Sequence, residues 1–197
     1  MLSRDEEPII ALCTPSGKGA LALLRLSGKD VRALADSIAR LPSSKKISLL
    51  PTHTIQYGTI IDHAGNSIDK VLFFIMDAPH TFTGQDVIEI SCHNNQFIIE
   101  SIIQQAIAHG ARLAEEGEFT RRAFELGKID LIQAESINEL IGAQTQYALK
   151  KSLSQLEGSF SQWIEILKKE LLQAIAWCEA SFEFLDEEVE FGTQITQ

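Results

Sequence analysis

The residues from Thr14 to Asp30, TPSGKGALALLRLSGKD, include a glycine–lysine–glycine group of the kind that binds phosphate. A nucleotide-binding P-loop has the pattern G-x-x-x-x-G-K-[ST], in which backbone N–H groups hold the phosphates and the hydroxyl reaches Mg²⁺. Here Gly19 replaces the hydroxyl residue, and Leu12 stands where the first glycine belongs. Because two of the four fixed positions differ, we exclude a P-loop, and these glycines need another explanation.

The other residue types that carry chemistry form no recognisable site. The three cysteines are far apart and odd in number, which indicates neither a disulfide framework nor a C-x-x-C metal knuckle. The five histidines show no i, i+4 pairing and no clustering with cysteine. We therefore predict no metal ligands and no catalytic nucleophile.

Length and composition are those of an ordinary globular protein: 197 residues, of which 45% are hydrophobic and 22% charged. No apolar run approaches the ~18 residues of a membrane span. The start, MLSRDEEPII, is acidic where a signal peptide is basic, so we expect a cytoplasmic protein without membrane contact. The formal charge of −10 argues against a broad nucleic-acid surface and leaves a local basic site open.

Hydrophobic patterns predict a mixed α+β region in the first two-thirds of the chain. Short strands are expected at residues 9–13, 21–26 and 86–92, and a hairpin of two strands joins residues 54–62 and 67–76 around DHAGN. Helical spacing is found at residues 31–41, and an amphipathic helix at 97–110 can end at Gly110.

After about residue 117 the pattern is helical throughout. Short helices are expected at 117–128 and 129–144, followed by one long helix from Thr145 to about Phe182, interrupted by Gly158. Its apolar stripe, spaced by threes and fours, needs a packing surface, because tertiary burial supplies most helical stability. Two interpretations are open: a fraying end with a solvated acidic run from Glu183 to Glu190, or a bundle whose other helices are missing or come from another chain.

Four segments, in this order and spacing, resemble the N-terminal portion of the MnmE (TrmE) family of bacterial tRNA-modification GTPases. They are TPSGKGALALLRLSG, PHTFTGQDVIEISCH, GARLAEEGEFTRRAFELGKIDLIQAESINELI, and LEGSFSQW leading to FEFLDEEVEF. The resemblance covers nearly the whole chain.

This resemblance implies a fold, a domain division and partners. Residues 1–126 are expected to form an α+β domain like the glycine-cleavage T-protein, which binds a tetrahydrofolate derivative (5-formyl- or 5,10-methylene-) and makes a homodimer. Residues 127–197 are expected to be the first part of an all-α helical-bundle domain. The family modifies C5 of the tRNA wobble uridine with MnmG, an FAD protein, and binds GTP, magnesium and potassium in a G domain. That domain is missing here, as is the family's C-terminal cysteine motif, so we expect the N-terminal part of a longer protein, not catalytic alone.

The resemblance also implies three cofactor-binding residues, namely Arg25, Glu89 and Lys128. Arginine offers a rigid, always charged fork of donors, although without the resemblance Arg25 would more readily be interpreted as capping a strand and pairing with a nearby carboxylate. A glutamate can accept two parallel donors, such as the 2-amino group and ring N–H of a pterin. Alternation places Val87, Glu89 and Ser91 on one face of their strand. Lysine can meet the folate glutamate tail or a ring oxygen as a compact cation.

Two departures from the family pattern bear on this pocket. The family has H-G-G after the glutamate strand, whereas this chain has His93-Asn94-Asn95, which adds two side chains where glycine lets backbone approach a ligand. Glu125, three residues before Lys128, is a possible competitor for its charge.

Three functions are compatible with these residues. The first is a folate-binding and dimerising module of such a GTPase, and the second is a dimerising assembly scaffold with weak or lost folate binding. The third is a freestanding folate-dependent transferase, against which the absent nucleophile counts. Fold alone cannot choose between them.

Overall fold

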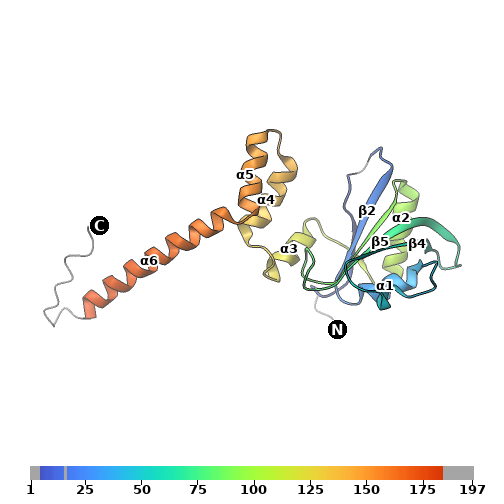
Figure 1. The fold of residues 1–197 in the computed structure, drawn as a ribbon, viewed down its shortest axis with the longest axis horizontal. Helices are drawn as coiled ribbons and strands as arrows, with labels where there is room; N and C mark the ends of the chain where they lie inside the picture. The colour runs from blue at the N-terminus through green and yellow to red at the C-terminus, as the bar shows by residue number, and fades with distance from the viewer. Residues whose placement is uncertain (1–4, 16, 184–197) are drawn as a thin grey trace. The chain divides into compact units, whose positions relative to one another are not determined.

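The computed structural model describes residues 5–15 and 17–183, which form two compact units, Met1–Ile129 and Asp130–Gln197 (Figure 1). The first unit mixes strands and helices, and the described part of the second is helical, which confirms the predicted α+β class. Within the described residues, no helix has the length and apolar character needed to cross a membrane.

The first unit is built on a seven-stranded sheet in the order β3-β4-β5-β6-β2-β1-β7. The strands are β1 (Ile9–Leu12), β2 (Leu21–Ser27), β3 (Ala39–Arg40), β4 (Thr54–Ile61), β5 (Ser67–Met76), β6 (Val87–His93) and β7 (Arg112–Leu113). All pairs are antiparallel except β1 with β7. The predicted β4–β5 hairpin is present, with Asp62 accepting hydrogen bonds from the backbone N–H groups of Ala64 and Asn66 in its turn.

One face of the sheet holds the hydrophobic core. Helices α1 (Val31–Ile38) and α2 (Gln96–Ala108) pack there, and α1 buries Val31, Leu34, Ala35 and Ile38, the spacing of one helical face. The sheet contributes alternate residues, including Leu24, Leu26, Phe73, Ile75, Ile88 and Ile90, all fully buried. The 3-10 helix η1 (Ile47–Leu49) and helix α3 (Glu118–Glu125) complete the unit.

The opposite face of the sheet, called the outer face below, carries the alternate set of side chains, and neither α1 nor α2 packs on it. Tyr57 and Ile55 on β4 are 52% and 59% exposed and lie directly across from Leu72 and Phe74 on β5. Arg25 of β2 and Glu89 of β6 belong to the same face, since their positions alternate with the buried ones.

The structure corrects several predicted boundaries. The first helix ends at Ile38 instead of residue 41, because Ala39 and Arg40 turn into extended backbone and pair with Ile60 and Thr59. The two-residue strands β3 and β7 and the single turn of η1 were not predicted, since such short pieces carry no periodic pattern.

The second unit contains α4 (Leu131–Gly142), α5 (Gln146–Leu156) and α6 (Ser159–Glu183). A capping box formed by Asp130 and Gln133 begins α4, and Thr145 caps α5. The prediction of one long helix from Thr145 was wrong: Gly158, at φ +86°, ends α5 and starts a new helix.

The apolar stripe predicted along this region is exposed in the structure of the second unit. Trp163, Leu171 and Ile175 are each more than half exposed, and Phe160 and Leu167 are 41% and 38% exposed. The acidic run beyond Glu183 lies outside the described residues.

Candidate functional site

Arg25 and Glu89 face each other at the centre of the outer face. They are register partners on the paired strands β2 and β6, so the sheet itself places their side chains together. Both Nε and Nη2 of Arg25 lie 2.8 Å from the same carboxylate oxygen, Oε1 of Glu89. Two of the three predicted cofactor-binding residues are therefore brought into direct contact.

This geometry leaves polar atoms of the pair unused. Within the part of the chain that the structure describes, Oε2 of Glu89 accepts no hydrogen bond and Nη1 of Arg25 donates none. Both side chains are only partly exposed, 23% for Arg25 and 17% for Glu89. The site can thus offer a ligand one carboxylate oxygen of Glu89 as acceptor and, from the part of the guanidinium turned away from Glu89, N–H donors of Arg25.

Two aromatic rings flank the Arg25 guanidinium. Its central carbon lies 5.4 Å from the ring centroid of Phe82 and 5.3 Å from that of Phe119, distances at which a cation is attracted to the ring face. Neither phenylalanine was assigned a role from the sequence, although both stand in the segments that carry the family resemblance. Both aromatic rings therefore lie against the charged group of Arg25.

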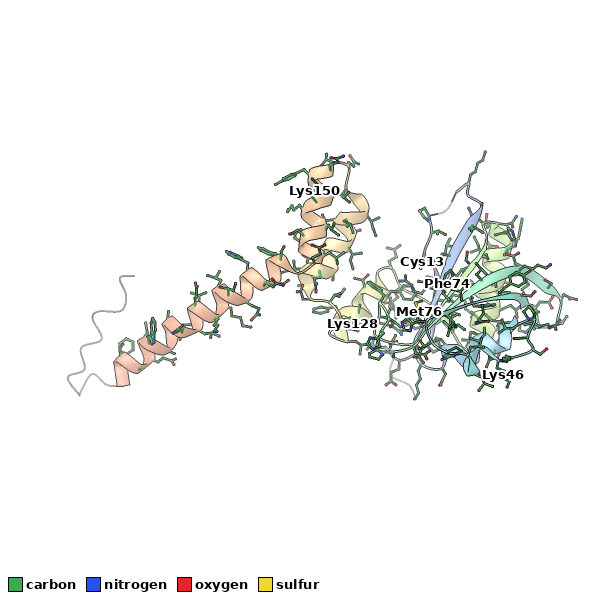
Figure 2. All side chains as sticks on the ribbon, viewed as in Figure 1. Cys13, Lys46, Phe74, Met76, Lys128 and Lys150 are labelled. Carbon is green, nitrogen blue, oxygen red and sulfur yellow. The ribbon has the colours of Figure 1, made fainter. Side chains whose placement is uncertain are left out.

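Apolar and sulfur groups complete the surroundings of the ion pair on the outer face (Figure 2). Phe74 of β5 is the cross-strand partner of Glu89 and is half-buried. The Cys13 thiol is close enough to be influenced by both charges: partial burial raises its pKa, the Arg25 charge lowers it and the Glu89 charge raises it, with a net increase. Cys92 is buried, which together with the charge of Asp69 raises its pKa to about 11.

Lys128 makes no contact with the ion pair in the described residues. Its Nζ donates to the Pro79 carbonyl at 2.8 Å, and its aliphatic stem lies against Gly84. Residues 79–84 belong to the loop that also carries Phe82, so one loop touches both Lys128 and Arg25. Glu125 is paired with Arg121 at 2.9 Å, and the expected competition for Lys128 is absent from these contacts.

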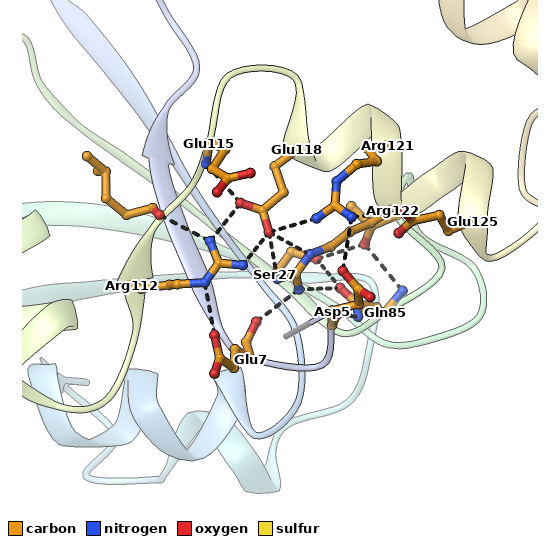
Figure 3. A network of polar contacts seen from close by, with 12 residues as sticks. Asp5, Glu7, Ser27, Gln85, Arg112, Glu115, Glu118, Arg121, Arg122 and Glu125 are labelled. Carbon is orange, nitrogen blue, oxygen red and sulfur yellow. Dashed lines mark hydrogen bonds and ion pairs between the residues drawn. The ribbon is translucent and has the colours of Figure 1, made fainter. Parts of the chain in front are cut away.

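Behind the site lies a buried network centred on Glu118, the first residue of α3 (Figure 3). Its side chain is fully buried and accepts hydrogen bonds from Arg112 at 2.8 Å, Arg122 at 2.9 Å and the Glu115 N–H at 2.8 Å. Burial raises its pKa, but these hydrogen bonds outweigh burial and lower the pKa of Glu118 to about 2. The carboxylate is therefore charged throughout the physiological range.

The network joins segments that are distant in sequence. Arg122 also donates to the Glu7 carbonyl at 2.9 Å and to the Gln85 side chain at 3.0 Å, while Arg112 pairs with the Glu7 carboxylate at 3.0 Å. It thereby ties α3 to the N-terminal segment and to the loop before β6. Since Phe119 directly follows Glu118, this attachment holds the Phe119 ring beside Arg25.

The Asn94-Asn95 departure has structural roles of its own. The Asn94 side chain donates to the Gly17 carbonyl at 2.8 Å, and a Cβ at Gly19 would lie 3.1 Å from its amide nitrogen. Asn95 caps α2 by accepting a hydrogen bond from the Phe97 N–H at 3.0 Å. Neither asparagine has a positive φ, so glycine is not required here. Gly19 of the β1–β2 loop therefore makes room for the Asn94 side chain.

Comparison with known proteins follows the same division of the chain. Residues 8–128 match the family model described as GTP-binding protein TrmE N-terminus, and residues 131–196 match the MnmE helical domain. Together these matches cover nearly all of the sequence.

Curated relatives bear the name tRNA modification GTPase MnmE. The protein of Geobacillus kaustophilus (strain HTA426) is 44% identical over 179 residues, which are 90% of this chain and 39% of that protein. The protein of Bacillus subtilis (strain 168) is 41% identical over 179 residues, again 90% of this chain and 39% of that protein. The protein of Symbiobacterium thermophilum is 39% identical over 189 residues. The chain thus spans about 39% of the length of the first two relatives. The chain belongs to the MnmE (TrmE) family and comprises its N-terminal and helical domains.

Proposed function

We propose that the outer face of the sheet binds a tetrahydrofolate derivative, 5-formyl- or 5,10-methylene-tetrahydrofolate, in a domain of the glycine-cleavage T-protein kind. The Oε2 of Glu89, which accepts no hydrogen bond from the described residues, is the observation that carries this proposal, and Nη1 of Arg25 likewise donates none among them. A pterin presents its 2-amino group and a ring N–H as neighbouring donors, and its flat ring can stack on an aromatic side chain such as Phe82 or Phe119.

The residues have separate roles in this proposal. Glu89 binds the pterin edge, Arg25 binds a ring carbonyl or the folate carboxylate, and the two phenylalanines limit water around them. Lys128 has two ammonium protons beyond the one given to Pro79 and can reach an anionic folate tail. When bound, the folate supplies the one-carbon unit.

The exposed apolar part of the outer face supports a homodimer. Ile55, Tyr57 and Leu72 are each at least 40% exposed and adjoin across paired strands, a patch that water contacts unfavourably. We infer that a second copy covers this patch. Tyr57→Lys should convert a dimer to a monomer in sedimentation equilibrium, whereas Leu49→Lys, at a still more exposed apolar residue of η1, should not. A dimer that persists in Tyr57→Lys would place the interface elsewhere.

The activity of the whole protein is also a proposal, because this chain spans only part of its relatives. Family membership supports modification of the tRNA wobble uridine at C5 together with MnmG. GTP binding, with magnesium and potassium, would belong to a G domain of a longer chain, since this sequence has no P-loop. The exposed apolar stripe of α6 would then pack against helices of that longer chain.

A dimerising scaffold without useful folate affinity is the second candidate. The ion pair between Arg25 and Glu89 favours it, because the two proposed anchors already satisfy much of each other's charge. Titration calorimetry with 5-formyltetrahydrofolate separates the two. The folate proposal expects binding that weakens at least tenfold in Arg25→Ala and Glu89→Gln, since a hydrogen bond to a charged group contributes about 1.5–3 kcal/mol. The control Glu100→Gln, an exposed glutamate of α2, should bind normally. No heat of binding in a folded dimer would favour the scaffold.

A further inference from the structure

A second charged surface lies at the end of α1, away from Arg25 and Glu89 in the fold. A pocket of about 310 Å³ opens between α1 and η1. Two buried apolar residues, Leu41 and Ile47, form part of its lining. Three cations also line it: Arg40, Lys45 and Lys46 (Figure 2 labels Lys46).

Arg40 differs from the other arginines of the first unit that the structure describes. Among the described residues, Arg25, Arg32, Arg112, Arg121 and Arg122 each pair with a carboxylate. Within that same part of the chain, Arg40 is in no ion pair, and the side chains of Lys45 and Lys46 make neither a hydrogen bond nor an ion pair. All three are exposed, so their charge is available to a ligand.

The nearby carboxylates are engaged elsewhere. Asp36, which also lines the pocket, accepts hydrogen bonds from the backbone N–H and the hydroxyl of Ser48. Asp62, in the β4–β5 turn, accepts hydrogen bonds from Asn66 and Ala64, and those from Asn66 lower its pKa. The pocket lining therefore carries three positive charges and one negative charge.

A fourth cation, Lys70, lies on the outer face of the sheet together with Arg40. Arg40 on β3 and Lys70 on β5 both pair with Thr59 on the strand between them, so the three side chains share one face. Because neighbouring strands are about 4.8 Å apart, the Arg40 and Lys70 positions are about 10 Å apart. Lys70 is exposed, and its side chain has no partner in the described residues.

We propose that Arg40, Lys45 and Lys46 of the pocket, together with Lys70 on the sheet, bind backbone phosphates of RNA. A small anion can contact only one or two of these cations, whereas a chain of phosphates can contact several at once. The net charge of −10 repels RNA over the rest of the surface, so a local cluster would also orient it. The choice of RNA rests on the proposed tRNA substrate.

The test is fluorescence anisotropy of a labelled tRNA transcript with the full 197-residue chain between 25 and 200 mM KCl. The double variant Lys45→Gln/Lys46→Gln should bind at least tenfold more weakly at low salt. The slope of log K against log salt should fall by about two, one for each lost phosphate contact. The control Lys18→Gln/Lys29→Gln removes the same charge from exposed lysines outside the pocket and should change binding less than threefold.

Three results would overturn the proposal. They are no RNA binding by the unaltered chain, the same dependence of log K on log salt in the two double variants, or the same loss of RNA affinity in the two double variants. Displacement of RNA by millimolar inorganic phosphate, beyond the effect of chloride at the same ionic strength, would instead indicate a site for a free anion. Folate titration of the Lys45→Gln/Lys46→Gln variant keeps the two proposals apart. Unchanged folate binding is expected, and absent folate binding in the unaltered chain would refute the folate proposal alone.

Discussion

The buried carboxylate of Glu118 should make the stability of the first unit depend on acid. Hydrogen bonds from Arg112, Arg122 and the Glu115 N–H overcome its burial and hold its pKa at about 2, against an ordinary value of 4.5. A pKa lowered on folding stabilises the protein above the unfolded pKa. This stabilisation is lost as pH falls from about 4.5 towards 2.

The size of the effect follows from the same values. The lowered pKa corresponds to about 3 kcal/mol of folding free energy at pH 7, of which about 2 kcal/mol is lost by pH 3. Glu118→Gln removes the charge and leaves Arg112 and Arg122 without their shared carboxylate, a change that costs about 3–5 kcal/mol in buried pairs. The variant should therefore be less stable at pH 7, and its difference from the unaltered protein should shrink by about 2 kcal/mol at pH 3.

The free energy of unfolding of the first unit can be measured at each pH by urea unfolding, with hydrogen exchange of the β2 and β6 backbone amides as the probe. Fluorescence would report the wrong unit, because Trp163 and Trp177 both lie in α6. The control is Glu125→Gln, an exposed carboxylate on the same helix paired with Arg121, which should cost less than about 1 kcal/mol. A free-energy difference for Glu118→Gln that is the same at pH 7 and pH 3 would refute the assignment of a lowered pKa. If the variant does not fold, a stability curve of the unaltered protein without loss between pH 4.5 and pH 3 would refute it equally.

Three further changes test other contacts. Gly158→Ala should destabilise the second unit by about 1–2 kcal/mol in tryptophan-monitored unfolding, because φ is +86° at this position. If the backbone were one uninterrupted helix, the same substitution would instead stabilise the unit by about 1 kcal/mol. Asn94→Gly should lower the melting temperature of the first unit through loss of the bond to Gly17, and an unchanged value would show that this bond contributes nothing. Phe119→Leu should weaken 5-formyltetrahydrofolate binding several-fold in calorimetry with little loss of stability, and equal affinity would remove the ring from the site.

Local patterns predicted much of the fold, and their failures have physical reasons. The β4–β5 hairpin was predictable because alternation and the Asp62 turn agree. The stripe of apolar residues keeps its spacing across Gly158, so periodicity alone cannot reveal that the backbone turns there. The strand pieces β3 and β7, two residues each, are fixed by their neighbours in space and leave no signal in sequence.

The site was predictable in its residues and less so in their contacts. Family resemblance indicated Arg25, Glu89 and Lys128 separately, but the Arg25–Glu89 ion pair depends on the β2–β6 register, which joins residues 64 positions apart. The network of Glu118 joins Glu7 to Arg112 across 105 positions, and no spacing rule reaches that far. Once the register is known, both arrangements follow from the alternation of strand side chains.

The central claim is that Glu89 accepts the donors of a pterin ring. The most direct measurement compares 5-formyltetrahydrofolate with its analogue lacking the 2-amino group, each titrated into the unaltered protein and into Glu89→Gln. If the carboxylate binds that group, the unaltered protein should lose at least tenfold in affinity for the analogue. Glu89→Gln should bind the analogue almost as tightly as it binds 5-formyltetrahydrofolate. The coupling energy between Glu89 and the 2-amino group should then be about 1.4 kcal/mol or above. Equal losses in both proteins would show that Glu89 and the 2-amino group do not meet, and would contradict the account.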